Sequence, residues 1–277
     1  MQKKLESYIY ESEPSTIKGY PPRFANQKRI QDCLKNLCET WVEYLQHYTE
    51  RTNDLFGKTE CAWSSTERAI VSTLAASIMR EFRSSIVLEE SRVLKPGNVA
   101  SDRGRCDLWA SIPELTSDVP IFNFYLEAKK SRQPKSYEAL KPHLLSKYGI
   151  SKLFRDFKKG HLKKLTDRSP FRNDRDRKHE HYVIGLLVTP LASKERDING
   201  IKEKLVSVFE NSHKLFVRPE EAGMDFLNDR RHIARYPTVA LILVDPNDKH
   251  PGMIASFTVL ASTNRLLASG TAKPKSK

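Results

Sequence analysis

Three ionisable residues, Asp107, Glu127 and Lys129, have the types and spacing that phosphodiester chemistry requires. Glu127 and Lys129 end the apolar run that begins at Ile121, and alternate residues of a strand share a face, so both project to the same side. Asp107 and Glu127 lie symmetrically about Ser117, so a hairpin turning there places the two carboxylates opposite each other. The sequence therefore predicts two carboxylates and an ammonium at one spot, which suits metal-dependent hydrolysis.

Each of these groups has a chemical reason to be there. Mg²⁺ prefers oxygen ligands, which Asp107, Glu127 and the backbone carbonyl of Ala128 can supply. We expect Lys129 to orient the attacking water, to help deprotonate it, or to stabilise the developing negative charge. The competing interpretation is an exposed ion pair between Glu127 and Lys129, which would be energetically minor.

The pattern resembles a known family. The segment 104–108, an apolar strand and the tripeptide 127–129 are similar to the motif of the PD-(D/E)xK nuclease superfamily, which has the restriction-endonuclease-like fold. The resemblance covers roughly residues 64–189. Cys106 stands where many members have proline, a departure that the family tolerates.

The resemblance carries expectations for individual residues. It implies that Asp107 and Glu127 bind Mg²⁺, for which Mn²⁺ can substitute, and that Lys129 serves catalysis. Many members also place a glutamate on the first core helix near the metal, and Glu67 occupies a comparable position. The alternative for Glu67 is a helix-capping role, because Ser64 three residues earlier completes a capping-box pattern.

The elements that must position these residues follow the order helix, three strands, helix and strand, then additions. This order predicts an α/β fold with a restriction-endonuclease-like core, in which a three-strand antiparallel meander belongs to a mixed sheet. The expected helices cover residues 26–46, a segment beginning near 64, 150–165 and 194–211. The expected strands cover residues 85–94, 106–112, 121–129, 182–188, 239–244 and 254–260.

Three regions are expected along the chain. Residues 1–63 form an N-terminal helical extension that starts with an irregular lead-in over residues 1–24, and residues 64–265 form the nuclease-like domain. The remaining residues, 266–277, form a flexible basic tail.

The net charge of +13 is concentrated in one stretch of the chain. Residues 129–178 contain 17 Lys or Arg against 5 Asp or Glu, and this stretch directly follows the candidate site. Such a concentration favours contact with a polyanion, whereas a solvated loop is the alternative. The basic residues expected to contact nucleic acid are Lys130, Arg132, Lys158, Lys159 and Lys163.

Composition excludes several classes of protein. With 39% hydrophobic and 29% charged residues, the chain suits a globular protein, and no apolar run approaches the roughly 20 residues of a membrane span. The N-terminus lacks a secretory signal, so we expect a cytoplasmic protein with no membrane partner. The four cysteines lack a Cys-x-x-Cys spacing, which argues against structural zinc.

Taken together, the sequence predicts a Mg²⁺-dependent endonuclease acting on DNA, with restriction or anti-phage defence as a biological setting and repair or recombination as alternatives. A second hypothesis is a catalytically inactive nucleic-acid-binding module that retains the nuclease fold. A third is a protein-interaction subunit, in which the N-terminal helices dock a partner or a second copy of the chain.

Overall fold

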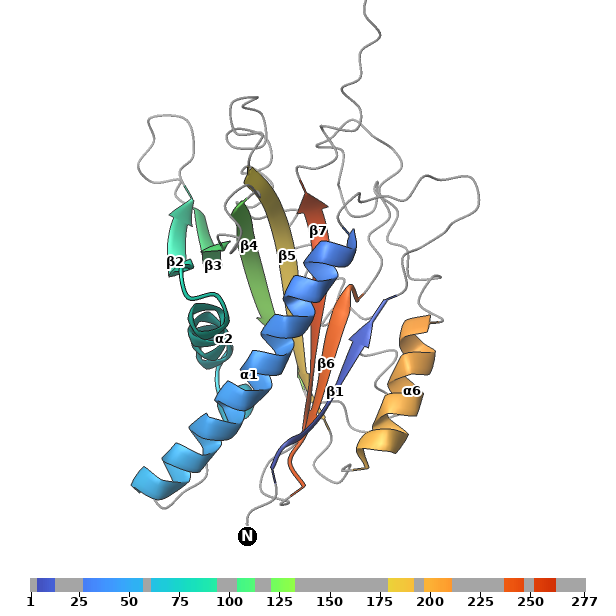
Figure 1. The fold of residues 1–277 in the computed structure, drawn as a ribbon. Helices are drawn as coiled ribbons and strands as arrows, with labels where there is room; N and C mark the ends of the chain where they lie inside the picture. Colours follow the sequence, from blue (N-terminus) through green and yellow to red (C-terminus); the bar gives the residue numbers. More distant parts are fainter. Residues whose placement is uncertain are drawn as a thin grey trace, which may run out of the picture.

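The main feature of the fold is one mixed β-sheet. The computed structural model describes residues 4–12, 27–56, 61–93, 104–112, 121–132, 179–191, 197–210, 237–246 and 252–262. In this part of the chain, seven strands form a single sheet in the order β1-β6-β7-β5-β4-β3-β2, and three α-helices pack against it (Figure 1). The protein is thus an α/β protein.

The elements have the following bounds. The strands are β1 (Glu6–Glu11), β2 (Ile86–Val93), β3 (Gly104–Ile112), β4 (Ile121–Lys130), β5 (His179–Pro190), β6 (Val239–Val244) and β7 (Met253–Ser262). The helices are α1 (Gln27–Phe56), α2 (Glu67–Glu81) and α6 (Ile198–Glu210), with a short 3₁₀ helix, η1, at Ala62–Ser64.

Strands β2, β3 and β4 form the expected antiparallel meander, and β4 then pairs in parallel with β5. In the β3–β4 hairpin, Leu108 pairs with Leu126 and Ile112 pairs with Phe122. Both pairs are symmetrical about position 117, so the predicted register is confirmed. The apolar residues of β5 are buried on both faces of the sheet, as its sequence predicts.

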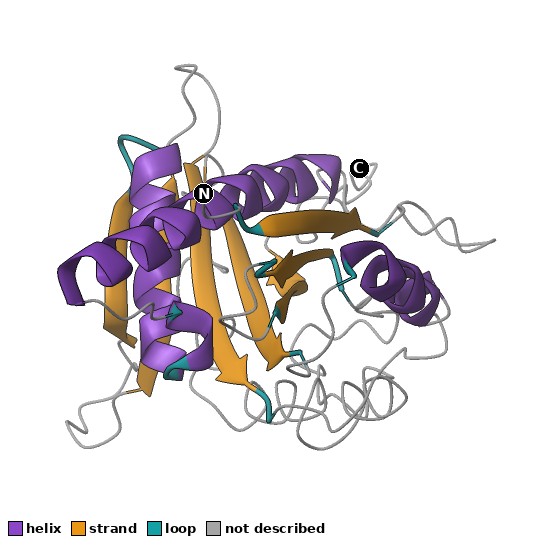
Figure 2. Ribbon diagram, turned by 90° about the horizontal axis from the view of Figure 1, so that it is seen from below, coloured by secondary structure: helices purple, strands orange, loops and turns teal. Residues whose placement is uncertain are grey.

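The helices lie on both faces of the sheet. Helices α1 and α2 cover one face, and α1 crosses several strands (Figure 1). Helix α6 lies against β1 and β6 on the opposite face, where Phe209 contacts the ring of Tyr10 and the Lys202 ammonium lies 4.3 Å from the ring centre of Tyr8 (Figure 2). The alternation of side chains along β1 explains this arrangement: Tyr8 and Tyr10 face α6, and Ile9 between them faces the core under α1.

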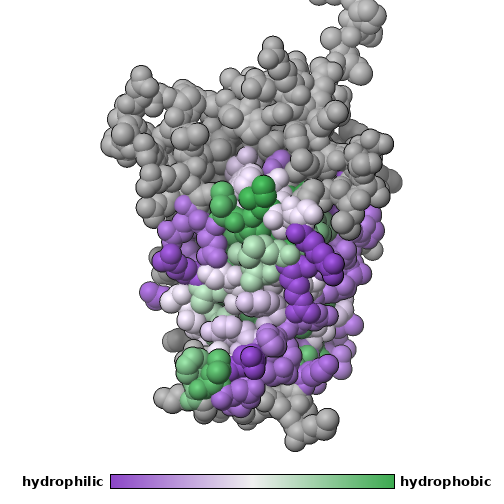
Figure 3. All heavy atoms as spheres, turned by 60° about the vertical axis from the view of Figure 1, so that its left-hand side comes forward, coloured by the Kyte–Doolittle hydropathy of each residue, from purple (hydrophilic) through white to green (hydrophobic). Residues whose placement is uncertain are grey.

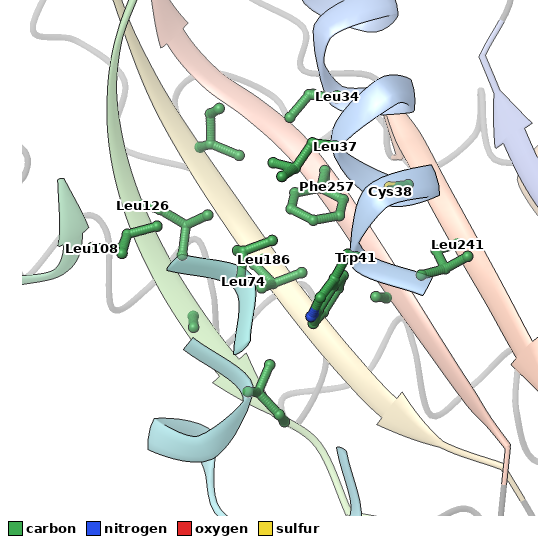
Figure 4. Close-up of a cluster of buried hydrophobic side chains, with 14 of the residues drawn as sticks. Leu34, Leu37, Cys38, Trp41, Leu74, Leu108, Leu126, Leu186, Leu241 and Phe257 are labelled. Atoms are coloured by element: carbon green, nitrogen blue, oxygen red, sulfur yellow. The ribbon is translucent and has the colours of Figure 1, made fainter. Parts of the chain in front are cut away.

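The core between α1, α2 and the sheet is continuous. In Figure 4, Leu34, Leu37 and Trp41 extend from α1 toward the sheet and meet Phe257 of β7. Trp41 is fully buried, and its indole N–H donates to the hydroxyl of Thr73 on α2 at 3.0 Å. This bond satisfies the polar end of a large apolar side chain, so α1 and α2 are joined by both packing and a hydrogen bond.

The structure differs from the sequence expectations near the N-terminus. Residues 6–11, expected to be irregular, form edge strand β1, and α1 continues to Phe56 rather than ending near residue 46. The N-cap of α2 is Thr66, whose hydroxyl accepts from the N–H of Ala69, and Ser64 belongs to η1 instead.

The expected helix at 150–165 and the tail at 266–277 lie outside the described residues.

Exposed apolar side chains occur mainly at the ends of elements. On the side of the molecule that carries α2 and β2, hydrophobic patches are separated by hydrophilic surface (Figure 3). The large hydrophobic residues most exposed are Leu55, Phe56, Met79, Ile86 and Leu88. No helix in the described ranges combines the length and the apolar character needed to cross a membrane.

Replacing Trp41 tests whether the α1–α2 layer supports the fold. We expect Trp41→Ala to lower the free energy of unfolding by about 3–5 kcal/mol, because it leaves a large cavity and removes the hydrogen bond that the Thr73 hydroxyl accepts from the indole. Urea unfolding followed by circular dichroism measures this change. Leu55→Ala is the control on the same helix, because Leu55 is 68% exposed. Equal effects from both substitutions would contradict the assigned core.

Candidate active site

The β3–β4 hairpin brings Asp107 and Glu127 together at one end of the sheet. The paired ladder ends at Leu108 and Leu126, and the same register continued by one residue sets Asp107 opposite Glu127. There the Asp107 carboxylate accepts the N–H of Ala128 at 2.7 Å. The Asp107 side chain therefore pairs with the Ala128 N–H of β4 just beyond the last paired residues of the hairpin. This hydrogen bond holds Asp107 beside β4.

The Lys129 ammonium lies among the oxygen atoms of the site. Its Nζ atom is 2.7 Å from Glu127 Oε1 and 3.9 Å from Asp107 Oδ2. It also donates to the Ala128 carbonyl at 2.8 Å and lies 3.6 Å from Glu67 Oε1. The three residues predicted from the motif, the Ala128 carbonyl and Glu67 thus converge on one point.

Glu67 is the first residue of α2 and links that helix to β4. Its Oε2 atom accepts the backbone N–H of Lys130 at 2.9 Å. The N-terminus of α2 is capped by Thr66, so the carboxylate of Glu67 is directed to β4 rather than to a capping box with Ser64. Of the two interpretations of Glu67, this contact favours its placement at the site.

Burial and mutual repulsion set the electrostatics of the site. Burial raises the pKa of Asp107 above its ordinary value, although the Ala128 N–H and the Lys129 charge lower it. Burial also raises the pKa of Glu127, and the charge of Asp107 raises it further. Burial lowers the pKa of Lys129, but Glu127 and the other carboxylates outweigh this effect, so the pKa is raised. The ammonium therefore stays charged and compensates the clustered acids.

Glu90 of β2 adds strain and charge next to Asp107. It lies opposite Asp107 in the β2–β3 register and has a φ of 48°, in the left-handed region. Glu89 accepts a hydrogen bond from Ser72, and Glu90 pairs with Arg68, so both carboxylates contact α2. Consecutive residues of a regular strand would point to opposite faces, and the positive φ of Glu90 explains why these two do not. No pattern in the sequence predicts this conformation.

The basic residues near the site have different environments. The Lys130 ammonium donates to the backbone carbonyls of Ser64 (2.7 Å) and Ser65, which ties η1 to β4, and burial lowers its pKa. Arg132 is exposed just after β4. Nucleic-acid contact by either residue stays a prediction. The other three basic residues predicted to bind nucleic acid, Lys158, Lys159 and Lys163, lie outside the described residues.

The nearest thiol does not add a nucleophile to the site. Cys106 is completely buried beside Asp107, and burial raises the pKa of its thiol to about 12. A thiol with so high a pKa is protonated at neutral pH and is a poor nucleophile. All four cysteines of the chain are free, so no disulfide constrains the site.

The donor atoms suit a hard divalent cation, although they surround an ammonium in this arrangement. Within the described residues, no group of three or more His, Cys, Asp or Glu side chains is arranged to hold a metal ion. The atoms around Lys129 Nζ are nevertheless all oxygens, from Asp107, Glu127, Glu67 and the Ala128 carbonyl. Oxygen donors of this kind are those that Mg²⁺ and Mn²⁺ prefer.

Comparison with known proteins gave no match. No family model, no curated protein and no solved structure matches this chain. Inferences about its function therefore rest on the residues and on their arrangement.

The strain at Glu90 can be tested by substitution. We expect Glu90→Gly to be more stable than Glu90→Ala by up to about 1 kcal/mol, because glycine adopts a positive φ without steric cost while alanine does not. Both variants remove the same carboxylate, so their difference isolates the backbone. Denaturant unfolding measures it, and equal stability of the two variants would argue against a strained Glu90.

The raised pKa of Glu127 predicts a pH-dependent stability. The pKa of Glu127 in the folded protein exceeds the ordinary value of 4.5, so the folded protein binds the Glu127 proton more tightly than the unfolded chain does. The stability that this proton contributes is therefore lost as the pH rises from 4.5 through the folded pKa. Glutamine does not titrate, so Glu127→Gln does not lose stability in this way as the pH rises. We expect the stability of the variant relative to wild type to increase between about pH 4 and about pH 7.

Urea unfolding at the two pH values measures the free energy of unfolding of Glu127→Gln and of wild type. Glu39→Gln, the same change at an exposed position of α1, is the control. A difference between Glu127→Gln and wild type that stays constant with pH, or shrinks as the pH rises, would contradict the raised pKa.

Proposed function

We propose that the protein is a metal-dependent endonuclease that hydrolyses phosphodiester bonds, with DNA as the substrate and restriction or anti-phage defence as its setting. One observation carries the proposal: Asp107, Glu127, Lys129 and the Ala128 carbonyl meet at the end of neighbouring strands, with every contact to Lys129 Nζ within 3.9 Å. A surface ion pair alone would not require the second carboxylate, the carbonyl or the burial that these groups share.

The proposed fold assignment is a restriction-endonuclease-like core. It is supported by helix α2, the antiparallel meander β2-β3-β4 and the parallel pairing of β4 with β5, which follow one another in this order along the chain. The second helix of this core, expected at 150–165, lies outside the described residues. The α/β architecture alone would not identify a nuclease, because one fold supports many functions. The position of the acidic and basic groups within the fold carries the functional inference.

The residues of the chain have distinct roles in this proposal. Asp107, Glu127 and the Ala128 carbonyl would hold Mg²⁺ or Mn²⁺, and Glu67 lies close enough to assist. When bound, the metal lowers the pKa of a bound water and neutralises charge on the phosphate. Lys129 supplies a positive charge that orients the water or stabilises negative charge developing on the phosphate oxygens. Burial at the strand ends strengthens each of these interactions.

A cleavage assay tests the proposal directly. Purified protein is incubated with plasmid DNA, linear duplex, single-stranded DNA and RNA in the presence of Mg²⁺, Mn²⁺ or EDTA. We expect cleavage of DNA with either metal and none with EDTA. Asp107→Ala, Glu127→Ala and Lys129→Ala should each reduce the rate by at least about a hundredfold, because each removes a group that contacts the metal or the reacting phosphate.

The controls separate loss of chemistry from loss of structure. Glu39→Gln, on an exposed part of α1 away from the site, should keep wild-type activity. Cleavage at wild-type rates by the three site variants would reject the assignment. DNA binding that is salt-sensitive and independent of Mg²⁺, without cleavage by any divalent ion, would instead identify an inactive binding module. Cleavage of RNA alone would change the substrate but keep the site.

A further inference from the structure

Lys129 occupies the position that a bound cation needs. Its ammonium contacts Glu127 Oε1 at 2.7 Å and the Ala128 carbonyl at 2.8 Å, and Asp107 and Glu67 carboxylate oxygens lie within 4 Å. Only 13% of the Lys129 side chain is exposed. The ammonium is therefore enclosed by the oxygen donors instead of extending to solvent, as lysine side chains on surfaces do.

The cluster requires a positive charge to remain assembled. Three carboxylates directed to one point repel one another, and burial strengthens the repulsion. Backbone donors offset part of it, because the Ala128 N–H bonds to Asp107 and the Lys130 N–H bonds to Glu67. The Lys129 ammonium is the only charged donor that contacts all three carboxylates among the described residues.

A divalent cation and this ammonium cannot use the same oxygens at once. Mg²⁺ takes carboxylate and carbonyl oxygens at roughly 2.0–2.1 Å, which is closer than any ammonium contact in the site. Two cations sharing Glu127 and the Ala128 carbonyl would repel each other at short range. The lysine stem has four rotatable bonds, whereas β4 is fixed by pairing on both edges, so the side chain is the part that can move.

From these contacts we infer that Lys129 is an internal counter-ion of the metal-free site, and that a divalent cation binds by displacing its ammonium. The inference rests on the proposed function. In the metal-free protein the ammonium holds the carboxylates in place and is shielded from a phosphate. Once displaced, the same positive charge is available to the substrate. Lys129 would thus contact the phosphate only after its ammonium has left the carboxylates.

Removing the ammonium tests the competition. Lys129→Met keeps the apolar stem and eliminates the charge. We expect this variant to bind Mn²⁺ at least about tenfold more tightly than wild type, measured by electron paramagnetic resonance of free Mn²⁺ at constant pH, because the competing cation is gone. Without metal it should unfold at a lower temperature than wild type, and Mn²⁺ should restore its stability. Lys35→Met, which removes an ammonium that pairs with Glu11 on β1, should change neither the affinity nor the effect of Mn²⁺.

A measurement on the wild-type chain keeps the test valid if Lys129→Met does not fold. Reductive methylation followed by mass spectrometry reports how accessible each lysine amine is. We expect Lys129 to react slowly without metal and at least several times faster with Mg²⁺, while Lys35 reacts equally in both conditions.

The outcomes separate this inference from the proposed function. If wild type binds Mn²⁺ and cleaves DNA, but Lys129→Met binds Mn²⁺ no more tightly, or Mg²⁺ leaves the labelling of Lys129 unchanged, the displacement is wrong and the nuclease assignment stands. If neither protein binds Mn²⁺ and wild type cleaves no substrate, the proposed function fails and the inference fails with it.

Discussion

The pairing of β4 on both of its edges is the constraint on which the site depends. Antiparallel pairing with β3 sets Asp107 opposite Glu127, and parallel pairing with β5 fixes the other edge of the strand. A slip of one residue in either ladder would move Glu127 and Lys129 to the opposite face of the sheet. The apolar residues Leu126 and Ala128, which are buried against the helical layer, oppose such a slip because it would expose them.

The same strand end concentrates negative charge, and the fold compensates for it locally. Buried carboxylates are tolerated when they are paired and hydrogen-bonded. Two backbone N–H groups of β4 bond to Asp107 and Glu67, and the Lys129 ammonium lies between the acids. Glu90, opposite Asp107, adopts a positive φ and pairs with Arg68, which turns its charge toward α2. Local strain at Glu90 thus accompanies the clustering of acids.

The helical layer connects the core to the site. Trp41 on α1 bonds to Thr73 on α2, and the N-terminus of α2 contributes Glu67 to the end of β4. The Lys130 ammonium binds the Ser64 carbonyl of η1, just before α2, so the start of this helix is attached to the strand. Packing far from the carboxylates therefore determines where Glu67 lies, which links the stability of the core to the geometry of the site.

Local sequence alone determined the strands of the meander and the facing of Asp107 and Glu127, because side-chain alternation and the symmetry about Ser117 are short-range properties of one hairpin. It could not determine that residues 6–11 form an edge strand, since their partner β6 lies more than 200 residues away and supplies the pairing. It also contained no sign of the left-handed Glu90, whose carboxylate pairs with Arg68 of α2. The motif identified which groups meet, but only the tertiary structure decided that the ammonium lies among the carboxylates, because that position depends on burial and on charges from three separate elements.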